Sequence, residues 1–404
     1  MRQRAPNDSP TIPGNFRFTS ADLVVAAVLL SLSAYLLIGG MVTSWATGPG
    51  LMNAGGVAVG RDFTMFWSAS LLALGENAAS VYDFQLIREV QGSLTGVPNP
   101  TYPGWLYPPT GLLFVAPVSL LPYKVSLVVW TLAGVCALGA VLWGVLRRPL
   151  AVVALLLFPA VGLCLINGQS SVFLAALLGG GLVLLDRRPW LAGFLLGIAT
   201  VKPQLILLVA PCLLVGRHWR ALGGLTVTLA GLVVVSLAVF GGAAWEGWLN
   251  NVVGAVDILV QVGPLEKMQS VLVAASLAGL DRGAAMALQA AVAALMLVVV
   301  GSLWYKRFPI EIRGSALLLA APLATPYSFD YDLAVLTVAL AWMALEIGRR
   351  GWLRGERVLA VLLWISPIAG WFIAVGTGII LTPLVLLACL WRVVRTAQNE
   401  IALP

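Results

Sequence analysis

The chain carries the stretch ADLVVAAVLLSLSAYLLIGGMV at residues 21–42, in which Asp22 stands at the entry and no other charged residue follows. A helix needs roughly 20 consecutive apolar residues to cross the hydrocarbon core of a bilayer. A secretory signal has a shorter apolar stretch that leads into a cleavage site at small residues. Before this stretch stand Arg2, Arg4 and Arg17. We therefore predict a retained transmembrane helix whose N-terminus lies in the cytoplasm.

The composition extends this prediction to the whole chain. Of 404 residues, 60% are hydrophobic and only 10% are charged, whereas soluble globular chains carry roughly 25% charged residues. The fold class is therefore an all-α integral membrane protein with a single domain over residues 1–404. The net charge of +7 does not point to nucleic acid, because the basic residues stand in short clusters between apolar segments, as in proteins whose Lys and Arg orient membrane helices.

These basic clusters predict the topology. If all of them face the cytoplasm, the number of spans is even, both termini are cytoplasmic, and about 12 transmembrane helices fit. The clusters are Arg147-Arg148, Arg187-Arg188, Arg217 with Arg220, Lys306-Arg307 with Arg313, Arg349-Arg350 with Arg354 and Arg357, and Arg392 with Arg395. The expected spans are 21–43, 124–146, 150–166, 170–185, 190–201, 204–216, 221–240, 283–304, 314–325, 332–347, 357–371 and 374–391.

Two long outer loops follow from this topology, at residues 43–123 and 241–282. In the first, Val81, Phe84, Ile87 and Val90 recur every three residues, which predicts a short amphipathic helix on the membrane surface. The apolar piece at residues 110–121 is too short to span, so we expect a re-entrant or interfacial helix. The second loop begins with Trp245 and Trp248, which are typical of an interfacial belt.

Two of the expected spans, 190–201 and 204–216, are short and meet at Lys202-Pro203-Gln204. A turn of this kind is tolerated inside a membrane where it lines a wet cavity. A lone lysine at such a turn suggests contact with an anion. The alternative is that Lys202 snorkels to the outer interface as an anchor.

Cysteine and histidine give no sign of a metal or cofactor site. Cys136, Cys164, Cys212 and Cys389 lie within expected spans without metal-type spacing, and the single His218 falls in a cytoplasmic turn. We expect no cofactor and no metal. Asp330 and Asp332 form the one close pair of outer acids, and a divalent ion bound there would overturn this expectation.

The stretch Gly60-Arg61-Asp62-Phe63-Thr64-Met65-Phe66-Trp67 places an acid among aromatic residues soon after the first span. Such an acid can sit at the outer membrane surface and face a cavity, where a lipid-linked substrate would be met. We find no nucleotide-binding glycine loop, so a lipid carrier is a more natural sugar donor than a nucleotide. The alternatives for Asp62 are an ion pair with Arg61 or a cap on the following helix.

The order of these pieces resembles the GT-C membrane glycosyltransferases, and within them the polyprenyl-phosphate-dependent glycosyltransferase family 87. The resemblance runs from about Ala21 to Trp342. Its pieces are residues 60–67, Tyr82-Asp83, Tyr107-Pro108-Pro109, Asn167-Gly168-Gln169, Lys202-Pro203-Gln204, and Pro326 with Ser328 in Ala-Thr-Pro-Tyr-Ser-Phe-Asp-Tyr-Asp at 324–332.

The resemblance implies a GT-C-type bundle and the transfer of a hexose, with mannose as one candidate, from a polyprenyl-phosphate sugar to a glycolipid or glycan. It implies that this happens on the outer face of a bacterial inner membrane, with Asp62 as general base in an inverting transfer. Family members that use a mannosyl donor often carry histidines where this chain has Asp330-Tyr331-Asp332, so the donor sugar does not carry over.

The other site residues follow from this chemistry. Residues expected to bind the donor phosphate or sugar are Lys202, Gln204, Asn167, Gln169, Tyr107 and Arg61. Expected contacts to the acceptor or sugar are Asp330, Asp332 and Tyr327, although the two aspartates could instead cap the following helix. Rival functions are a lipid-linked sugar flippase or other transporter, which would show inverted repeats and midplane charges, and a ligase that moves a preassembled glycan.

Overall fold

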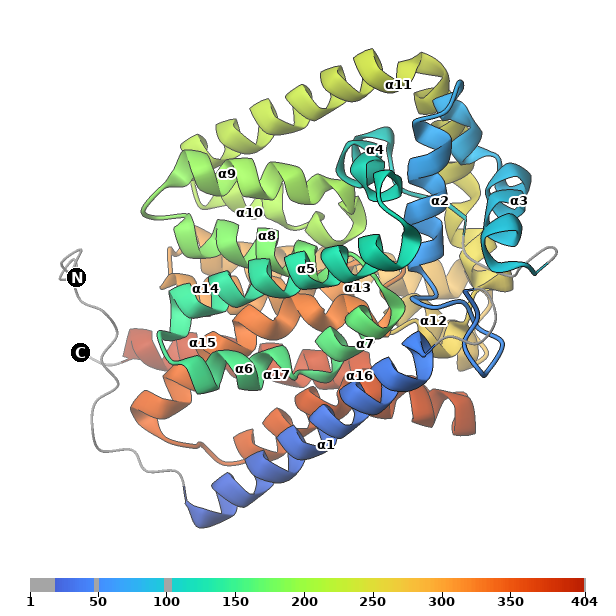
Figure 1. Ribbon diagram of the computed structural model, residues 1–404. Helices are drawn as coiled ribbons and strands as arrows, with labels where there is room; N and C mark the ends of the chain where they lie inside the picture. The colour runs from blue at the N-terminus through green and yellow to red at the C-terminus, as the bar shows by residue number, and fades with distance from the viewer. Residues whose placement is uncertain (1–18, 47–50, 98–103, 403–404) are drawn as a thin grey trace.

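The computed structural model describes residues 19–46, 51–97 and 104–402, and every regular element in those residues is a helix (Figure 1). Arg2, Arg4 and Arg17 lie outside the described residues. The α-helices are α1 (Ser20–Trp45), α2 (Phe63–Ala73), α3 (Phe84–Thr95), α4 (Pro109–Val115), α5 (Tyr123–Leu146), α6 (Pro149–Leu156), α7 (Pro159–Asn167), α8 (Ser171–Leu184), α9 (Pro189–Ile198), α10 (Val209–Val215), α11 (Trp219–Val262), α12 (Val271–Leu277), α13 (Arg282–Tyr305), α14 (Ile310–Ala324), α15 (Thr337–Arg350), α16 (Glu356–Thr377) and α17 (Thr382–Ala402). Short 3-10 helices are η1 (Ala78–Tyr82), η2 (Ala116–Leu120), η3 (Ala199–Val201), η4 (Pro203–Ile206), η5 (Leu265–Lys267) and η6 (Asp330–Leu336).

Helices occupy all twelve positions expected from the sequence, but the count of about 12 spanning helices is not confirmed. Among the described residues, six helices are long and apolar enough to cross a membrane, and a seventh candidate is the pair α6 and α7, which is bent by 61°. The six are Ser20–Trp45, Tyr123–Leu146, Trp219–Val252, Arg282–Tyr305, Asp330–Arg350 and Glu356–Thr377. Proline explains much of the difference, because it begins α6, α7, α9 and η4 and cannot continue a preceding helix without losing a hydrogen bond.

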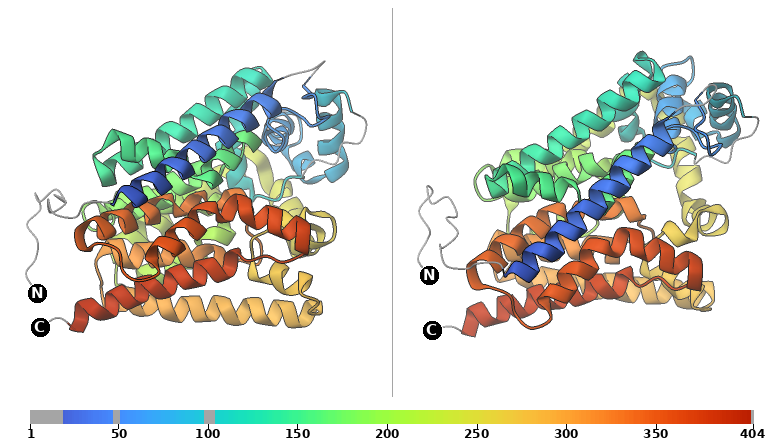
Figure 2. Two further views of the ribbon diagram at one scale, coloured as in Figure 1. Left: turned by 90° about the horizontal axis from the view of Figure 1, so that it is seen from below. Right: turned by 60° about the horizontal axis from the view of Figure 1, so that its bottom comes forward.

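The two ends of the bundle differ. Helices α2, α3 and α4 gather at one end, and α1 begins and α17 ends at the other (Figure 1). The most apolar window of α1 is only 6% buried, whereas that of η6 with α15 is 83% buried. Helix α1 therefore lies at the periphery, as Figure 2 shows, and the segment that begins at Asp330 lies in the centre of the protein.

The aromatic residues around Asp62 pack inside the protein, which corrects their expected interface-like setting. Phe63 and Phe66 are at most 1% exposed. They contact Trp130 at ring-centroid distances of 6.1 and 5.3 Å. Trp105 joins the same cluster at 6.1 Å from Phe66. The first loop thus shares a hydrophobic core with α5 and α11, which fixes the position of its backbone.

The amphipathic segment at η1 and α3 also turns apolar side chains toward the protein. Val81 and Ile87 are fully buried in the aromatic cluster around Phe66. Asp83 caps α3, because its side chain accepts hydrogen bonds from the backbone N–H groups of Gln85 and Leu86. The expected position of this helix on the membrane surface is not confirmed, and its residues Val81 and Ile87 pack against protein.

Helix α11 continues beyond the expected end of its span at residue 240. Gly241 breaks it with φ 77° and ψ 169°, a backbone conformation that glycine adopts at little cost, and helical structure then runs on to Val262. The Trp248 indole N–H donates to the carbonyl of Leu106 at 3.3 Å, and the Asn251 amide donates to the carbonyl of Tyr82 at 2.7 Å. The segments expected to form the two outer loops therefore pack against each other.

Candidate active site

Two glycines hold the backbone of Asp62 against the turn between α7 and α8. Gly60 and Gly168 have φ angles of 68° and 64°, which favour glycine. A Cβ atom on Gly168 would lie 2.6 Å from the Cβ of Phe63 and 3.2 Å from the carbonyl oxygen of Gly60. The Asp62 N–H donates to the carbonyl of Asn167 at 3.1 Å. This close approach brings the Asp62 side chain next to Gln169.

The side chain that bonds to the Asp62 carboxylate is an amide and not a cation. It is 9% exposed, and its Oδ2 accepts a hydrogen bond from Gln169 Nε2 at 3.1 Å. Within the described part of the chain, Asp62 makes neither a side-chain cap on α2 nor an ion pair with Arg61. Arg61 is exposed and has φ 26°. Neither of the two alternatives considered for Asp62, the ion pair or the cap, is therefore seen.

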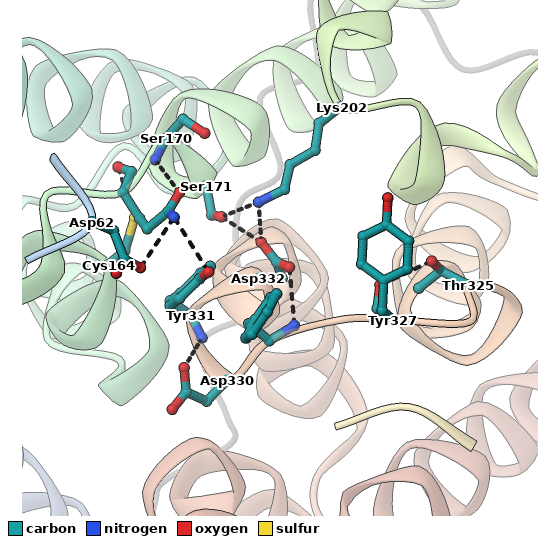
Figure 3. A network of polar contacts seen from close by, with 12 residues as sticks. Asp62, Cys164, Ser170, Ser171, Lys202, Thr325, Tyr327, Asp330, Tyr331 and Asp332 are labelled. Carbon is teal, nitrogen blue, oxygen red and sulfur yellow. Dashed lines mark hydrogen bonds and ion pairs between the residues drawn. The ribbon is translucent and has the colours of Figure 1, made fainter. Parts of the chain in front are cut away.

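The Gln169 side chain makes three hydrogen bonds. Its Nε2 also donates to the hydroxyl oxygen of Tyr331 at 3.2 Å, and its Oε1 accepts from the Ser170 N–H at 3.1 Å (Figure 3). The residue is 4% exposed. An amide nitrogen has two hydrogens, so Asp62 and Tyr331 use both of them.

Lys202 lies at the turn between η3 and η4 and is 4% exposed. Its ammonium group donates to Ser171 Oγ at 3.1 Å and forms an ion pair with Asp332 Oδ1 (Figure 3). It also lies 5.4 Å from the centre of the Tyr331 ring. Because a snorkelling lysine extends its charge to water, this buried and paired lysine does not have that role.

The two aspartates of the Asp-Tyr-Asp stretch have different partners. Asp332 Oδ2 accepts from the Phe329 N–H at 3.0 Å at the start of η6, and Asp332 Oδ1 accepts from Ser171 Oγ at 2.6 Å. Asp330 accepts from the Tyr331 N–H at 2.7 Å and points away from Lys202 (Figure 3). Among the described residues, no group of three or more His, Cys, Asp or Glu side chains is arranged to hold a metal ion.

A cavity opens beside this network. Polar side chains and apolar side chains of α11 line it together. Its lining includes Tyr107, Gln169, Lys202, Gln204, Tyr327 and Tyr331, with Leu106, Pro203, Trp248 and Val252. Figure 3 shows Tyr327 and Lys202 on one side of the network and Asp62 on the other. The cavity therefore combines a cation and hydrogen-bond donors with an apolar wall.

Two tyrosines at the cavity keep their protons. Burial raises the pKa of Tyr107, and the charge of Lys202 lowers it by less. Burial likewise raises the pKa of Tyr327 to about 12. Both phenols are therefore neutral at physiological pH and can donate hydrogen bonds to a ligand.

Most of the residues singled out in the sequence gather here, and two exceptions stand out. The Asn167 amide donates to the carbonyl of Leu163 at 2.7 Å within its own helix, so only its backbone carbonyl takes part in holding Asp62. Arg61 is exposed. Sequence reasoning missed Ser171 and Tyr331; a buried lysine that needs partners was the one available signal for Ser171.

A family model described as glycosyltransferase family 87 matches residues 105–326. The match covers more than half of the 404 residues. The chain belongs to glycosyltransferase family 87. The described residues hold at least six apolar helices of spanning length, so it is a multi-pass membrane glycosyltransferase.

The family 87 match includes part of the site only. Tyr107, Gln169 and Lys202 lie within it, whereas Asp62 and Asp332 lie outside it. Comparison with curated proteins and with solved structures finds no significant match. The roles of individual residues therefore have to be argued from the geometry.

Proposed function

We propose that this protein transfers a hexose from a polyprenyl-phosphate sugar to a glycolipid or glycan acceptor. The reaction takes place on the outer face of a bacterial inner membrane, with both termini in the cytoplasm. The observation that carries the proposal is the Asp62 carboxylate, which has no cationic partner among the described residues and lies one amide away from a cavity lined by Lys202. In a family 87 member this is an arrangement for base-assisted sugar transfer.

In the proposed reaction, Asp62 takes the proton from the acceptor hydroxyl as the oxygen attacks the anomeric carbon. The new carbon–oxygen bond forms on one side of the sugar while the bond to the phosphate oxygen breaks on the other. The electron pair of that bond leaves with the lipid phosphate. Attack from the opposite side inverts the anomeric configuration, and the anionic leaving group needs hydrogen-bond donors rather than an acid.

Lys202 is the proposed donor to this phosphate. An ammonium group has three hydrogens, and Ser171 and Asp332 accept two of them. The third has no acceptor among the described residues and can bond to a phosphate oxygen in the cavity that Lys202 lines. The phenols of Tyr107 and Tyr327 and the amide of Gln204 line the same cavity and can donate to the phosphate or to sugar hydroxyls.

The apolar part of the cavity lining supports a lipid-linked donor over a nucleotide sugar. Leu106, Trp248 and Val252 stand on the cavity wall within reach of the Lys202 turn. Val252 is 37% exposed, so this wall includes apolar surface that a lipid chain could cover. A polyprenyl chain matches such a wall, whereas a nucleoside would leave its polar groups unpaired.

Purified protein in liposomes tests this proposal. It would be given radiolabelled polyprenyl-phosphate mannose or glucose in one arm and the matching nucleotide sugars in another, with lipid extract from bacterial envelopes as acceptor. We expect label to enter the acceptor fraction from a polyprenyl-phosphate donor only. Transfer from a nucleotide sugar would contradict the proposal, and so would movement of the donor across the bilayer without transfer, which would point to a flippase.

A further inference from the structure

We propose that the Gln169 side chain is a partition between the base and the donor cavity. The acceptor hydroxyl displaces this side chain when it binds. Gln169 then sets the preference of the enzyme for its acceptor over water. This inference rests on the proposed function, with Asp62 as the base. It adds a specificity-determining role to a residue that was expected only to bind the donor.

The position of Gln169 carries the inference. Gln169 and Tyr331 line the cavity, whereas Asp62 is not among the described residues that line it. The Gln169 amide links Asp62 to the cavity. Its nitrogen donates to Asp62 Oδ2 at 3.1 Å and to the hydroxyl of Tyr331, which lines the cavity, at 3.2 Å. A donor sugar in the cavity therefore meets Gln169 before it meets the base.

The hydrogen bonds identify what replaces the amide. A base must receive a proton donor on its carboxylate, and in the structure an amide N–H occupies Oδ2 of Asp62. An acceptor hydroxyl that arrives at the base can take over this position. Its O–H would then donate to Asp62 Oδ2 in place of the Gln169 N–H. The Asp62 carboxylate and the Tyr331 hydroxyl are separated by no more than two hydrogen-bond lengths. A single hydroxyl oxygen can therefore bridge them once the amide has moved.

A water molecule cannot make the additional binding contacts that an acceptor makes. Gln169 is held at Asp62, Tyr331 and the Ser170 N–H, and moving it breaks these bonds together. A glycolipid or glycan brings further contacts that offset this cost, whereas a single water molecule does not. If the partition opened without an acceptor, water would lose a proton to Asp62, bond to the anomeric carbon and release the lipid phosphate. The products would be free hexose and polyprenyl phosphate.

Two variants of Gln169 test the partition. Gln169→Ala removes the side chain and opens the path to the base. Gln169→Met removes the same hydrogen bonds but keeps a side chain of similar length, so it still fills the space. For each variant and the wild type, two rates are measured with radiolabelled polyprenyl-phosphate hexose. One is release of free hexose by purified protein without acceptor, and the other is transfer to lipid extract from bacterial envelopes.

We expect Gln169→Ala to raise the ratio of hydrolysis to transfer by about tenfold, because it removes both the hydrogen bonds that hold the partition in place and the side chain that fills the path to the base. Gln169→Met should raise this ratio by less. Tyr331→Phe, which removes one of the three contacts and keeps the ring, should shift it in the same direction and serves if Gln169→Ala does not fold.

An unchanged ratio in all three variants, with wild-type transfer intact, would overturn the partition and leave the proposed function standing. In that case Gln169 would only orient Asp62, and its loss would lower both rates together. Absence of transfer and of hydrolysis in the wild type would overturn the proposed function and this inference with it.

Discussion

The ammonium group of Lys202 is bonded to the carboxylate of Asp332, which lies 130 positions further along the chain. The side chain of Lys202 is 5% exposed and that of Asp332 is fully buried. The pair joins the turn between two short helices to the first turn of η6, and Ser171 bonds to both partners. One ion pair therefore connects three segments that build the site.

This pair predicts a non-additive effect on stability. Lys202→Met leaves the Asp332 carboxylate buried without a cation, and we expect a loss of about 3–5 kcal/mol. Adding Asp332→Asn to Lys202→Met removes the unpaired charge but keeps an acceptor for the Phe329 N–H, so part of the stability should return. Thermal unfolding of the purified single and double variants measures this coupling.

If the losses of stability in Lys202→Met and Asp332→Asn simply add in the double variant, the two residues are not a coupled buried pair. Transfer activity separates the two roles of Lys202. The double variant should stay inactive even where its stability recovers, because a donor to the phosphate is still missing.

The contact between Gly60 and Gly168 predicts a sensitive position that carries no chemistry. Gly168→Ala has to place a Cβ 2.9 Å from the side chain of Leu127 and closer still to Phe63, at a positive φ. We expect a cost of about 2–3 kcal/mol from overpacking and backbone strain, together with reduced transfer, because the turn that carries Gln169 shifts from Asp62.

Gly144→Ala in α5 is the matched control, because a Cβ there has no neighbour within 4 Å. It should be neutral or slightly stabilising, since alanine favours a helix interior. Equal melting temperatures of the Gly168→Ala and Gly144→Ala variants would show that the close approach of Gly168 does not matter.

The proposed topology predicts which surface residues face the outside of the cell. Glu76 follows α2 and Arg187 lies in the turn between α8 and α9, and both are exposed. In intact spheroplasts, Glu76→Cys should react with a membrane-impermeant maleimide, whereas Arg187→Cys should react only after the membrane is broken. The wild type, with its four free cysteines, gives the background. Labelling of Arg187→Cys in intact cells would reverse the orientation.

Local patterns predicted the positions of the helices well. The uninterrupted apolar run of residues 21–42 became α1, and Lys202-Pro203-Gln204 became a turn on the cavity. The number of spanning helices was not predictable in this way. Apolar composition identifies a buried helix and a lipid-facing helix alike, and η6 with α15 is mostly buried in protein while α1 is not.

Partners that are distant in sequence could not be predicted. The position of Lys202 suggested an anion, but nothing local to it points to Asp332 or Ser171. The aromatic residues beside Asp62 are typical of a membrane interface, yet Phe63 and Phe66 pack on Trp130 from a later helix. Pairings of this kind depend on how the helices fold together, and a single sequence does not encode them in a readable pattern.

If Asp62 is the base of the sugar transfer, transfer should depend on its carboxylate, and Asp62→Asn removes that carboxylate. Asparagine keeps the shape of the side chain and an acceptor for the Gln169 amide but cannot take a proton at neutral pH. Transfer from radiolabelled polyprenyl-phosphate hexose would be compared in the wild type, Asp62→Asn and Glu76→Gln, a control for loss of an exposed outer acid, at equal amounts of folded protein. We predict at least a 100-fold loss for Asp62→Asn, within the range of about 10²–10⁴ that general base catalysis supplies, and wild-type rates for Glu76→Gln. Transfer by Asp62→Asn at the wild-type rate would show that Asp62 is not the base.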